Sequence, residues 1–305
     1  MKYGSVAITG ASGWVGRCAL DLFAGQMSLR VHGFASRERP IITGSGEWAL
    51  APLAALAEEH LHAPALLVDC AFPTQDKVDV MGDREYTLAV EQRRALIVDV
   101  IRGQQALDVI YISSGAASLV AAGAAVAHRS QVYGQAKLDD EVALGATVAA
   151  TGGGLCVVRA FALSGPYMTK PDTYALGSMI VQAQATGMVE VRADRPVRRS
   201  YMAIADMMRV AADAVGRCDA GELVMFETTG EVVEMCDLAA RVLAATGNDP
   251  GAVHRPAFDA GGAADEYLGD PAALARLAAV AAVTPANLGD QVAHTAEWLI
   301  REGAS

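Results

Sequence analysis

The sequence predicts an α/β protein in which a doubly wound parallel sheet is followed by a smaller C-terminal lobe. In the first half of the chain, short β-rich runs alternate with helical stretches, which is typical of a parallel sheet covered by helices on both faces. After Pro166 this alternation gives way to segments separated by Pro and Gly. We therefore expect one domain over residues 1–165 and a second over residues 166–305, with some later segments returning to the first.

The elements of the first domain can be predicted in order along the chain. Short apolar runs predict strands at Ser5–Thr9, Leu29–Ala35, Leu66–Ala71, Val109–Ser113 and Leu155–Phe161. The stretches between them predict crossover helices at Val15–Ala24, Leu53–His62, Glu85–Arg102 and Val132–Ala149. The Gly-rich segment Thr151–Gly154 is expected to end the last helix. In the second domain, helical runs are expected at Tyr174–Thr186, Ile204–Val215, Met235–Thr246 and Gln291–Arg301.

Composition excludes several classes of partner and site. The net charge of -11 repels polyanions, so nucleic acid is not expected to bind. The five cysteines are scattered without the short spacing of metal sites, so we expect reduced thiols and no metal. The longest nearly apolar run, Ala116–Ala127, is shorter than the ~20 residues that a bilayer crossing needs. No long apolar signal segment follows the first residues, and we expect a cytoplasmic protein.

A glycine-rich loop follows the first predicted strand. Its G-x-x-G-x-x-G spacing would allow a tight turn, a close backbone approach to a pyrophosphate and free N–H groups at a helix start. The alternative is a turn that is Gly-rich by chance, but the strand–loop–helix context favours a dinucleotide site in a Rossmann fold. We expect cofactor contacts from this loop and from the ends of two other strands: Gly10, Ser12, Gly13, Trp14, Val15, Gly16, Ala71 and Phe161.

The end of the second strand bears on which dinucleotide is bound. An NAD-selective site normally has Asp or Glu there, which accepts a hydrogen bond from the ribose 2′-hydroxyl. This chain has Ser36 and Arg37, and a hydroxyl beside a guanidinium suits a 2′-phosphate. The sequence therefore predicts NADP, with NAD as the second choice. The alternative is that Arg37 and Arg39 are ordinary solvated loop charges.

Tyr133 and Lys137 form a candidate catalytic pair. Their i,i+4 spacing puts both side chains on one face of a helix. A free phenol has a pKa of ~10, and a neighbouring ammonium favours its ionised form, which makes it an effective acid–base group near neutral pH. Ser114, after the fourth predicted strand, would bind the reacting oxygen, although Ser113 and Ser114 also suit an ordinary strand-end turn. The nearby Asp139, Asp140 and Glu141 are expected on the solvated face of the same helix.

Together these motifs resemble the extended short-chain dehydrogenase/reductase family, in the NAD-dependent epimerase/dehydratase branch that acts on nucleotide-linked sugars. The matching segments are Thr9–Gly16, Ile112–Ser114, Tyr133–Lys137, Val158–Phe161 with Ser164–Pro166, Arg199–Tyr201 with Asp206, and Thr295–Leu299. The resemblance covers nearly the whole chain. It implies a Rossmann domain with a C-terminal substrate-binding lobe.

The resemblance also implies roles for single residues. Tyr133 would be the acid/base, Lys137 would bind the nicotinamide ribose and tune Tyr133, and Ser114 would orient the substrate oxygen. Arg199 would reach a substrate phosphate, unless it is a surface ion-pair residue. A homodimer would form through the helices Glu85–Arg102 and Val132–Ala149.

Three departures from the family pattern narrow the expected chemistry. Family dehydratases carry Asp-Glu directly after the catalytic hydroxyl, where this chain has Gly115 and Ala116, so sugar 4,6-dehydration is not expected. Sugar-nucleotide enzymes usually have Asn where Val90 and Ala162 stand. The leading hypothesis is an NADPH-dependent reductase of a keto group on a nucleotide-activated sugar. A sugar epimerase is the alternative, and a non-catalytic dinucleotide-sensing protein is the second.

Overall fold

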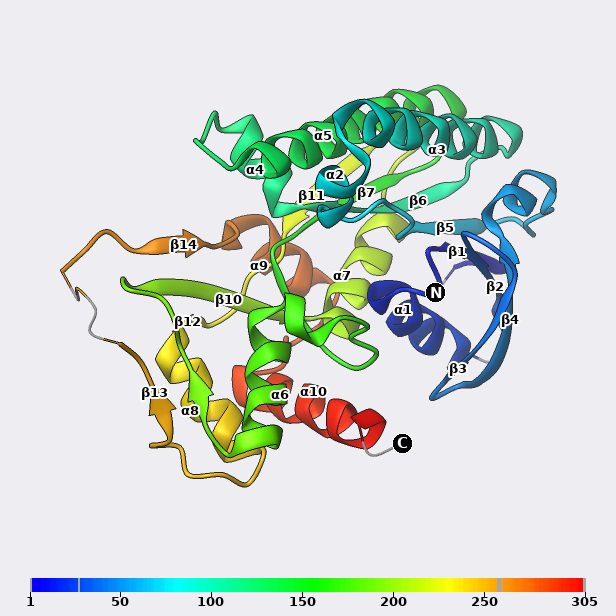
Figure 1. Ribbon diagram of the computed structural model, residues 1–305. Coiled ribbons are helices and arrows are strands. Elements are labelled where there is room, and N and C mark those ends of the chain that lie inside the picture. The colour runs from blue at the N-terminus through cyan, green and yellow to red at the C-terminus, as the bar shows by residue number, and fades with distance from the viewer. Residues whose placement is uncertain (1, 27, 257–258, 260, 304–305) are drawn as a thin grey trace. The chain divides into compact units, whose positions relative to one another are not determined.

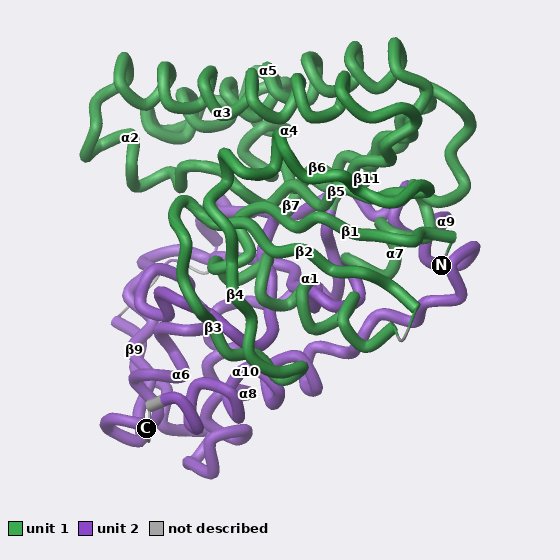
Figure 2. Tube along the Cα trace, turned by 90° about the vertical axis from the view of Figure 1, so that its right-hand side faces the viewer, with its two compact units in different colours: residues 1–160, 208–227 green, residues 161–207, 228–305 purple. Residues whose placement is uncertain are grey.

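The computed structural model describes residues 2–26, 28–256, 259 and 261–303. The chain forms two compact units, coloured separately in Figure 2. Unit 1 comprises residues 1–160 and 208–227, and unit 2 comprises residues 161–207 and 228–305. Compared with the expected boundary after residue 165, the chain leaves unit 1 after Ala160 and returns to it at Met208.

Unit 1 is built on a mainly parallel sheet. Among the described residues its strands lie in the order β11-β7-β6-β5-β1-β2-β4-β3, and only β3 is antiparallel to its neighbour. The strands are β1 (Ser5–Thr9), β2 (Arg30–Ala35), β3 (Arg39–Thr43), β4 (Gly46–Pro52), β5 (Ala65–Asp69), β6 (Asp108–Ser114), β7 (Leu155–Ala160) and β11 (Leu223–Glu227). This order confirms the predicted doubly wound fold. The strand order reverses between β1 and β5, and ligands of such sheets bind outside the carboxyl ends of the strands at that point.

Helices cover both faces of this sheet, with α3 and α5 on one face and α1 on the other (Figure 1). The helices are α1 (Trp14–Ala24), α2 (Asp76–Met81), α3 (Asp83–Gly103), α4 (Gly115–Ala121), α5 (His128–Thr151) and α7 (Ile204–Gly216), the last of which begins in unit 2. Ile97, Ile101, Leu144 and Val148 pack on the strand residues below them and are almost fully buried. As expected, α5 ends where Gly152 adopts a left-handed conformation with φ +78°.

The crossover helix expected at Leu53–His62 is much shorter than predicted. Only the 3-10 helix η1 (Leu53–Glu58) forms there, and the hairpin β3–β4, which was not predicted, precedes it. Asp21 of α1 accepts hydrogen bonds from the backbone N–H groups of Gly44 and Ser45 in the hairpin turn. Because β4 also pairs with β2, the hairpin extends the sheet just before η1 begins.

Unit 2 combines short strands with four α-helices in the described residues. Its helices are α6 (Ala175–Thr186), α8 (Met235–Ala245), α9 (Pro271–Val280) and α10 (Leu288–Gly303), together with the 3-10 helix η2 (Pro171–Thr173). Its strands are β8 (Ala162–Ser164), β9 (Val189–Glu190), β10 (Val197–Ala203), β12 (Val232–Glu234), β13 (Val253–His254) and β14 (Asp265–Tyr267). The expected helical runs are confirmed, whereas α9 and the strands were not predicted. No helix in the described part of the chain is long and apolar enough to cross a membrane.

Candidate active site

The glycine-rich loop lies at the carboxyl end of β1 and requires glycine at two positions. Gly10 has φ +62°, and a Cβ there would lie 2.7 Å from the carbonyl carbon of Cys70. A Cβ at Gly16 would lie 2.3 Å from the carbonyl oxygen of Gly10. Gly13 donates a 2.9 Å hydrogen bond to that same oxygen, which closes the turn just before α1 begins. The two glycines thus allow the tight turn and the close helix–strand packing of a pyrophosphate-binding loop at a helix N-terminus.

The other predicted cofactor residues of unit 1 lie at the same edge of the sheet. Ser36 and Arg37 are exposed between β2 and β3. Ala71 follows β5, and its N–H donates a 3.0 Å hydrogen bond to Oγ1 of Thr9. Because β2 and β5 flank β1 in parallel, their carboxyl ends lie beside the glycine-rich loop. The tight glycine turn at the start of α1, where no described side chain caps the helix, fits the pyrophosphate of a dinucleotide.

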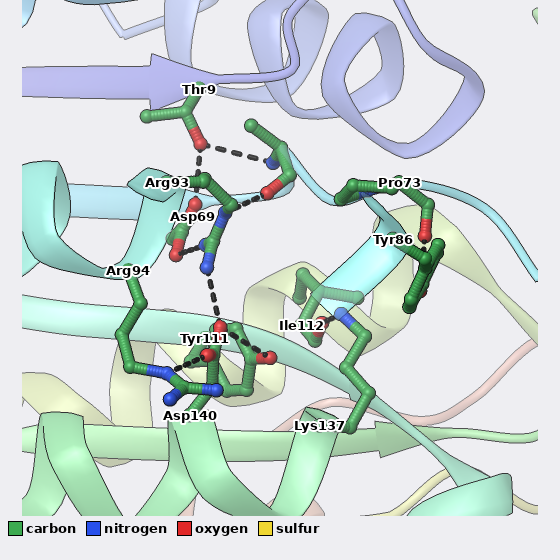
Figure 3. Close-up of polar contacts among 11 residues, drawn as sticks. Thr9, Asp69, Pro73, Tyr86, Arg93, Arg94, Tyr111, Ile112, Lys137 and Asp140 are labelled. Atoms are coloured by element: carbon green, nitrogen blue, oxygen red, sulfur yellow. Dashed lines mark hydrogen bonds and ion pairs between the residues drawn. The ribbon is translucent and has the colours of Figure 1, made fainter. Parts of the chain in front are cut away.

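Lys137 projects from α5 into the interior of unit 1 and is 3% exposed. Its ammonium donates a 2.7 Å hydrogen bond to the carbonyl oxygen of Ile112 on β6 (Figure 3). It also lies 3.6 Å from the ring centroid of Phe72 and 5.9 Å from that of Tyr133. The predicted pair is therefore brought together, with the ammonium beside the carboxyl end of β6.

Burial in these apolar surroundings lowers the pKa of Lys137 from its ordinary value to about 7. The positive charge of Arg93 acts in the same direction, whereas the carboxylates of Asp140 and Asp69 act against it. The Lys137 ammonium is thus able to lose its proton near neutral pH.

Tyr133 is half-buried, and its ring lies edge-on to Phe72 with centroids 5.6 Å apart. It packs on a small cluster that includes Tyr86 and Val90. Directly after Tyr133, Gly134 allows α5 to approach α4, since a Cβ there would lie 2.6 Å from the carbonyl oxygen of Ala116. This close approach sets the Tyr133 turn of α5 against the first turn of α4.

The two candidate serines have different surroundings. Ser113 donates a hydrogen bond to the carboxylate of Glu141, which forms a 2.7 Å ion pair with Arg159. Ser114 caps the N-terminus of α4 and accepts a 3.2 Å hydrogen bond from the N–H of Ala116. That contact uses a lone pair of the Ser114 hydroxyl, so its proton is still able to reach a substrate oxygen. Of the two hydroxyls, Ser114 is the better placed to bind a ligand.

Residues 6–225 match the model of the NAD dependent epimerase/dehydratase family. The chain belongs to this family. The family assignment, the Rossmann fold and the prediction that the protein is an enzyme are thereby confirmed. A nicotinamide dinucleotide is the cofactor class of the family, in agreement with the glycine-rich loop. No curated protein matches the chain.

Solved structures of other family enzymes share the fold at low sequence identity. MoeE5 in complex with UDP-glucose and NAD is 20% identical, with a TM-score of 0.70 over 99% of this chain and 100% of that one. The UDP-N-acetylglucosamine 4-epimerase from Methanobrevibacter ruminantium M1 in complex with UDP-N-acetylmuramic acid is 14% identical, with a TM-score of 0.77 over 99% and 100%. The NAD-dependent NDP-hexosamine 5,6-dehydratase TunA is 20% identical, with a TM-score of 0.72 over 98% of each chain.

Two predicted site residues of this family member lie in unit 2. The N–H of Phe161 donates a 2.8 Å hydrogen bond to Thr228, and its ring centroid lies 4.6 Å from that of Tyr267. Arg199 lies on β10 and pairs with the carboxylate of Asp265 at 3.1 Å. This contact agrees with the alternative in which Arg199 is a surface ion-pair residue. Arg199 stays partly exposed despite the pair.

The expectation that Asp140 and Glu141 are solvated is wrong. Asp140 is fully buried and Glu141 is 9% exposed, because α3 and β6 cover this face of α5. Asp140 pairs with Arg93 and Arg94 of α3, and Arg93 also pairs with Asp69 (Figure 3). The sequence pattern assigned no role in the site to Asp69, Arg93 or Arg94.

A signal for this buried cluster was present in the sequence. The buried residues of α3 are Tyr86, Val90, Arg93, Ile97, Val100 and Ile101, which follow the spacing of a helix face. An arginine in the middle of such an apolar face needs a buried carboxylate partner. The partner itself, Asp140, could not be assigned from spacing alone.

Proposed function

We propose that the chain is an NADPH-dependent reductase of a keto group on a nucleotide-activated sugar. The observation that carries the proposal is the buried Lys137 one helical turn from Tyr133, beside the end of β6 that bears Ser114. Family membership and the UDP-sugars named with the similar solved structures support the substrate class.

In this proposal, each side chain has one task. The nicotinamide, when bound, supplies the hydride. The phenol of Tyr133 donates a proton to the carbonyl oxygen that is reduced, and the Lys137 ammonium stabilises the phenolate that this transfer leaves. Ser114 donates a hydrogen bond to the same oxygen as negative charge develops on it.

The choice of coenzyme rests on the turn after β2. Ser36 and Arg37 are exposed there, where a carboxylate would favour NAD. A guanidinium can bind a 2′-phosphate through two parallel hydrogen bonds. In unit 2, which we propose as the substrate-binding lobe, Arg199 would exchange its contact with Asp265 for a substrate phosphate.

An epimerase is the second candidate, and the family description favours it. An epimerase needs the same three side chains, because it oxidises and then re-reduces the sugar. Gly115 and Ala116 supply no acid and base for sugar 4,6-dehydration. A non-catalytic sensor would have no use for a general acid at Tyr133.

One experiment separates these candidates. The purified protein is incubated with UDP-4-ketosugars and NADPH, and in parallel with UDP-glucose or UDP-N-acetylglucosamine without reductant. A reductase oxidises one NADPH for each UDP-sugar whose keto group is converted to a hydroxyl. Interconversion of the 4-epimers without net oxidation would identify an epimerase instead, and inactivity on every sugar would favour the sensor.

We also propose a homodimer in which α3 and α5 pack against the same helices of a second copy. Leu88 of α3 and Val142 of α5 are 53% and 74% exposed. Small and aliphatic residues continue along α5 and would allow close helix packing: Ala136, Leu138, Ala143, Ala146 and Ala149.

A further inference from the structure

Arg93 links several elements of unit 1 beneath the candidate site. Its Nε donates a hydrogen bond to the carbonyl oxygen of Ala71, and its terminal nitrogens pair with Asp69 and Asp140. The Arg93 side chain is 7% exposed. One side chain from α3 therefore connects the end of β5 with α5, the helix that carries Tyr133 and Lys137.

The carboxylates that bind Arg93 are themselves fixed. Thr9 of β1 donates a 2.6 Å hydrogen bond to Asp69. Tyr111 of β6 donates a 3.1 Å hydrogen bond to Asp140, and Arg94 pairs with the other oxygen of that carboxylate. Buried charges with this many partners hold one geometry, because any other arrangement leaves a charge without a partner.

Arg93 and Lys137 share two aromatic rings. The guanidinium carbon of Arg93 lies 5.3 Å from the ring centroid of Phe72 and 5.8 Å from that of Tyr111. The Lys137 ammonium lies 3.6 Å and 4.8 Å from the same two centroids. Both cations are attracted to these rings and repel each other across them.

We propose that Arg93 is a positioning residue of the site, which fixes the Lys137 ammonium against the Ile112 carbonyl through the Phe72 and Tyr111 rings that the two cations share. The inference rests on the proposed role of Lys137 in catalysis. Arg93 touches neither reacting atoms nor substrate in this scheme and acts only through Lys137.

Because charged groups surround Lys137, the protonation of its ammonium depends on where Arg93 lies. The groups that face it come from four elements: Arg93 of α3, Asp69 and Cys70 of β5 and its end, Tyr111 of β6, and Tyr133 and Asp140 of α5. Two carboxylates balance the charges of Arg93 and Arg94, so a protonated Lys137 adds a net positive charge to a buried cluster. The titration midpoint of Lys137 should therefore change when Arg93 is removed or displaced.

NMR of protein labelled with ¹³C-lysine measures this proton directly and needs no substrate. The chain has only four lysines, and Lys2, Lys77 and Lys170 are exposed internal references. The Lys137 signal is assigned by its loss in Lys137→Arg. Its titration midpoint in the wild type should lie near pH 7.

Three variants test the position of Arg93. Arg93→Met removes the repelling cation and leaves both carboxylates, so the Lys137 midpoint should rise by about one pH unit or more. Asp140→Asn removes an attracting carboxylate while Arg93 keeps Asp69, so the midpoint should fall. Arg94→Met is the matched control, because Arg94 also pairs with Asp140 but has no contact with the Phe72 ring among those described. It should move the midpoint much less than Arg93→Met does.

The Lys137 midpoints of these variants show whether Arg93 positions Lys137 or only stabilises the fold. Equal effects of Arg93→Met and Arg94→Met would overturn the proposal, since the effect would then act through Asp140 alone. If Arg93→Met does not fold, an unchanged midpoint in Asp140→Asn would overturn it as well. The titrations need no substrate, so their result does not depend on whether the protein is a reductase. The positioning hypothesis and the reductase hypothesis can therefore be rejected independently.

Discussion

Lys137 of α5 donates a 2.7 Å hydrogen bond to the carbonyl oxygen of Ile112, two residues before Ser114 on β6. This bond connects the helix that carries the acid/base candidate with the strand that carries the hydroxyl candidate. Together with the hydrogen bonds of Tyr111 to Asp140 and of Ser113 to Glu141, it fixes α5 against β6. The relative position of Tyr133 and Ser114 is therefore set in part by a main-chain contact of Lys137.

The first prediction concerns the chemical step. Tyr133→Phe keeps the ring that packs on Phe72 and removes only the hydroxyl, so coenzyme binding should survive. Turnover of a ketosugar should fall by about 10²-fold or more, the lower end of general acid–base contributions. Steady-state rates and coenzyme titration by fluorescence measure the two quantities. Near wild-type turnover would show that another group donates the proton.

The second prediction concerns the coenzyme. Arg37→Ala should weaken NADPH binding by about tenfold to a hundredfold, since a charge-assisted hydrogen bond to phosphate is lost. NADH binding should change little, because NADH has no 2′-phosphate. Arg39→Ala, at the exposed start of β3, is the control and should leave the NADPH/NADH ratio unchanged. Wild-type protein that binds NADH as tightly as NADPH would contradict the assignment.

The third prediction concerns the glycine-rich loop. Gly16→Ala would bring a Cβ to 2.3 Å from the Gly10 carbonyl oxygen, a backbone atom that cannot easily move. We expect a loss of about 1–3 kcal/mol in the free energy of unfolding and weaker binding of either coenzyme. Gly103→Ala is the control, because a Cβ at Gly103 meets nothing within 4 Å. Denaturant unfolding compares the two, and equal stability would refute the close packing.

The fourth prediction is a pH dependence of stability without cofactor. The pKa of Lys137 is lowered to about 7 in the folded chain and lies at its ordinary value of 10.5 in the unfolded one. Between these values the unfolded state binds more protons, so this group adds stability as the pH rises. The free energy of unfolding of the wild type should therefore increase relative to Lys137→Met from pH 7 to pH 9. A pH-independent difference between the two proteins would contradict a desolvated Lys137.

The fifth prediction concerns the dimer. Val142→Glu puts a charge on the exposed face of α5 and should shift the protein to a monomer, because the carboxylate would be desolvated in a helix interface. Val280→Glu changes an exposed valine of α9 and is the control. Light scattering at micromolar concentration reports the mass. A wild-type monomer would exclude the proposed interface.

The sequence by itself was sufficient for the features that depend on neighbours along the chain. A strand, a glycine-rich turn and a helix follow one another within Ser5–Ala24, so their periods and glycine spacing predict the loop. The pairing of Tyr133 with Lys137 follows from the pitch of a single helix. The parallel, doubly wound sheet was predicted from the alternation of short strands with helical stretches.

Only the tertiary structure decided which charges are buried and what pairs with them. Asp140 has the spacing of a solvated helix face, and its burial depends on Arg93 in a different helix and Tyr111 in a strand. The hairpin β3–β4 likewise depends on a turn bound by Asp21 of α1 and on pairing with β2. Such contacts join residues far apart in the chain, and local propensity contains no information about them. The free energy of burying a charged side chain depends on the partners that it meets in the folded chain, and its place in a periodic sequence pattern does not reveal those partners.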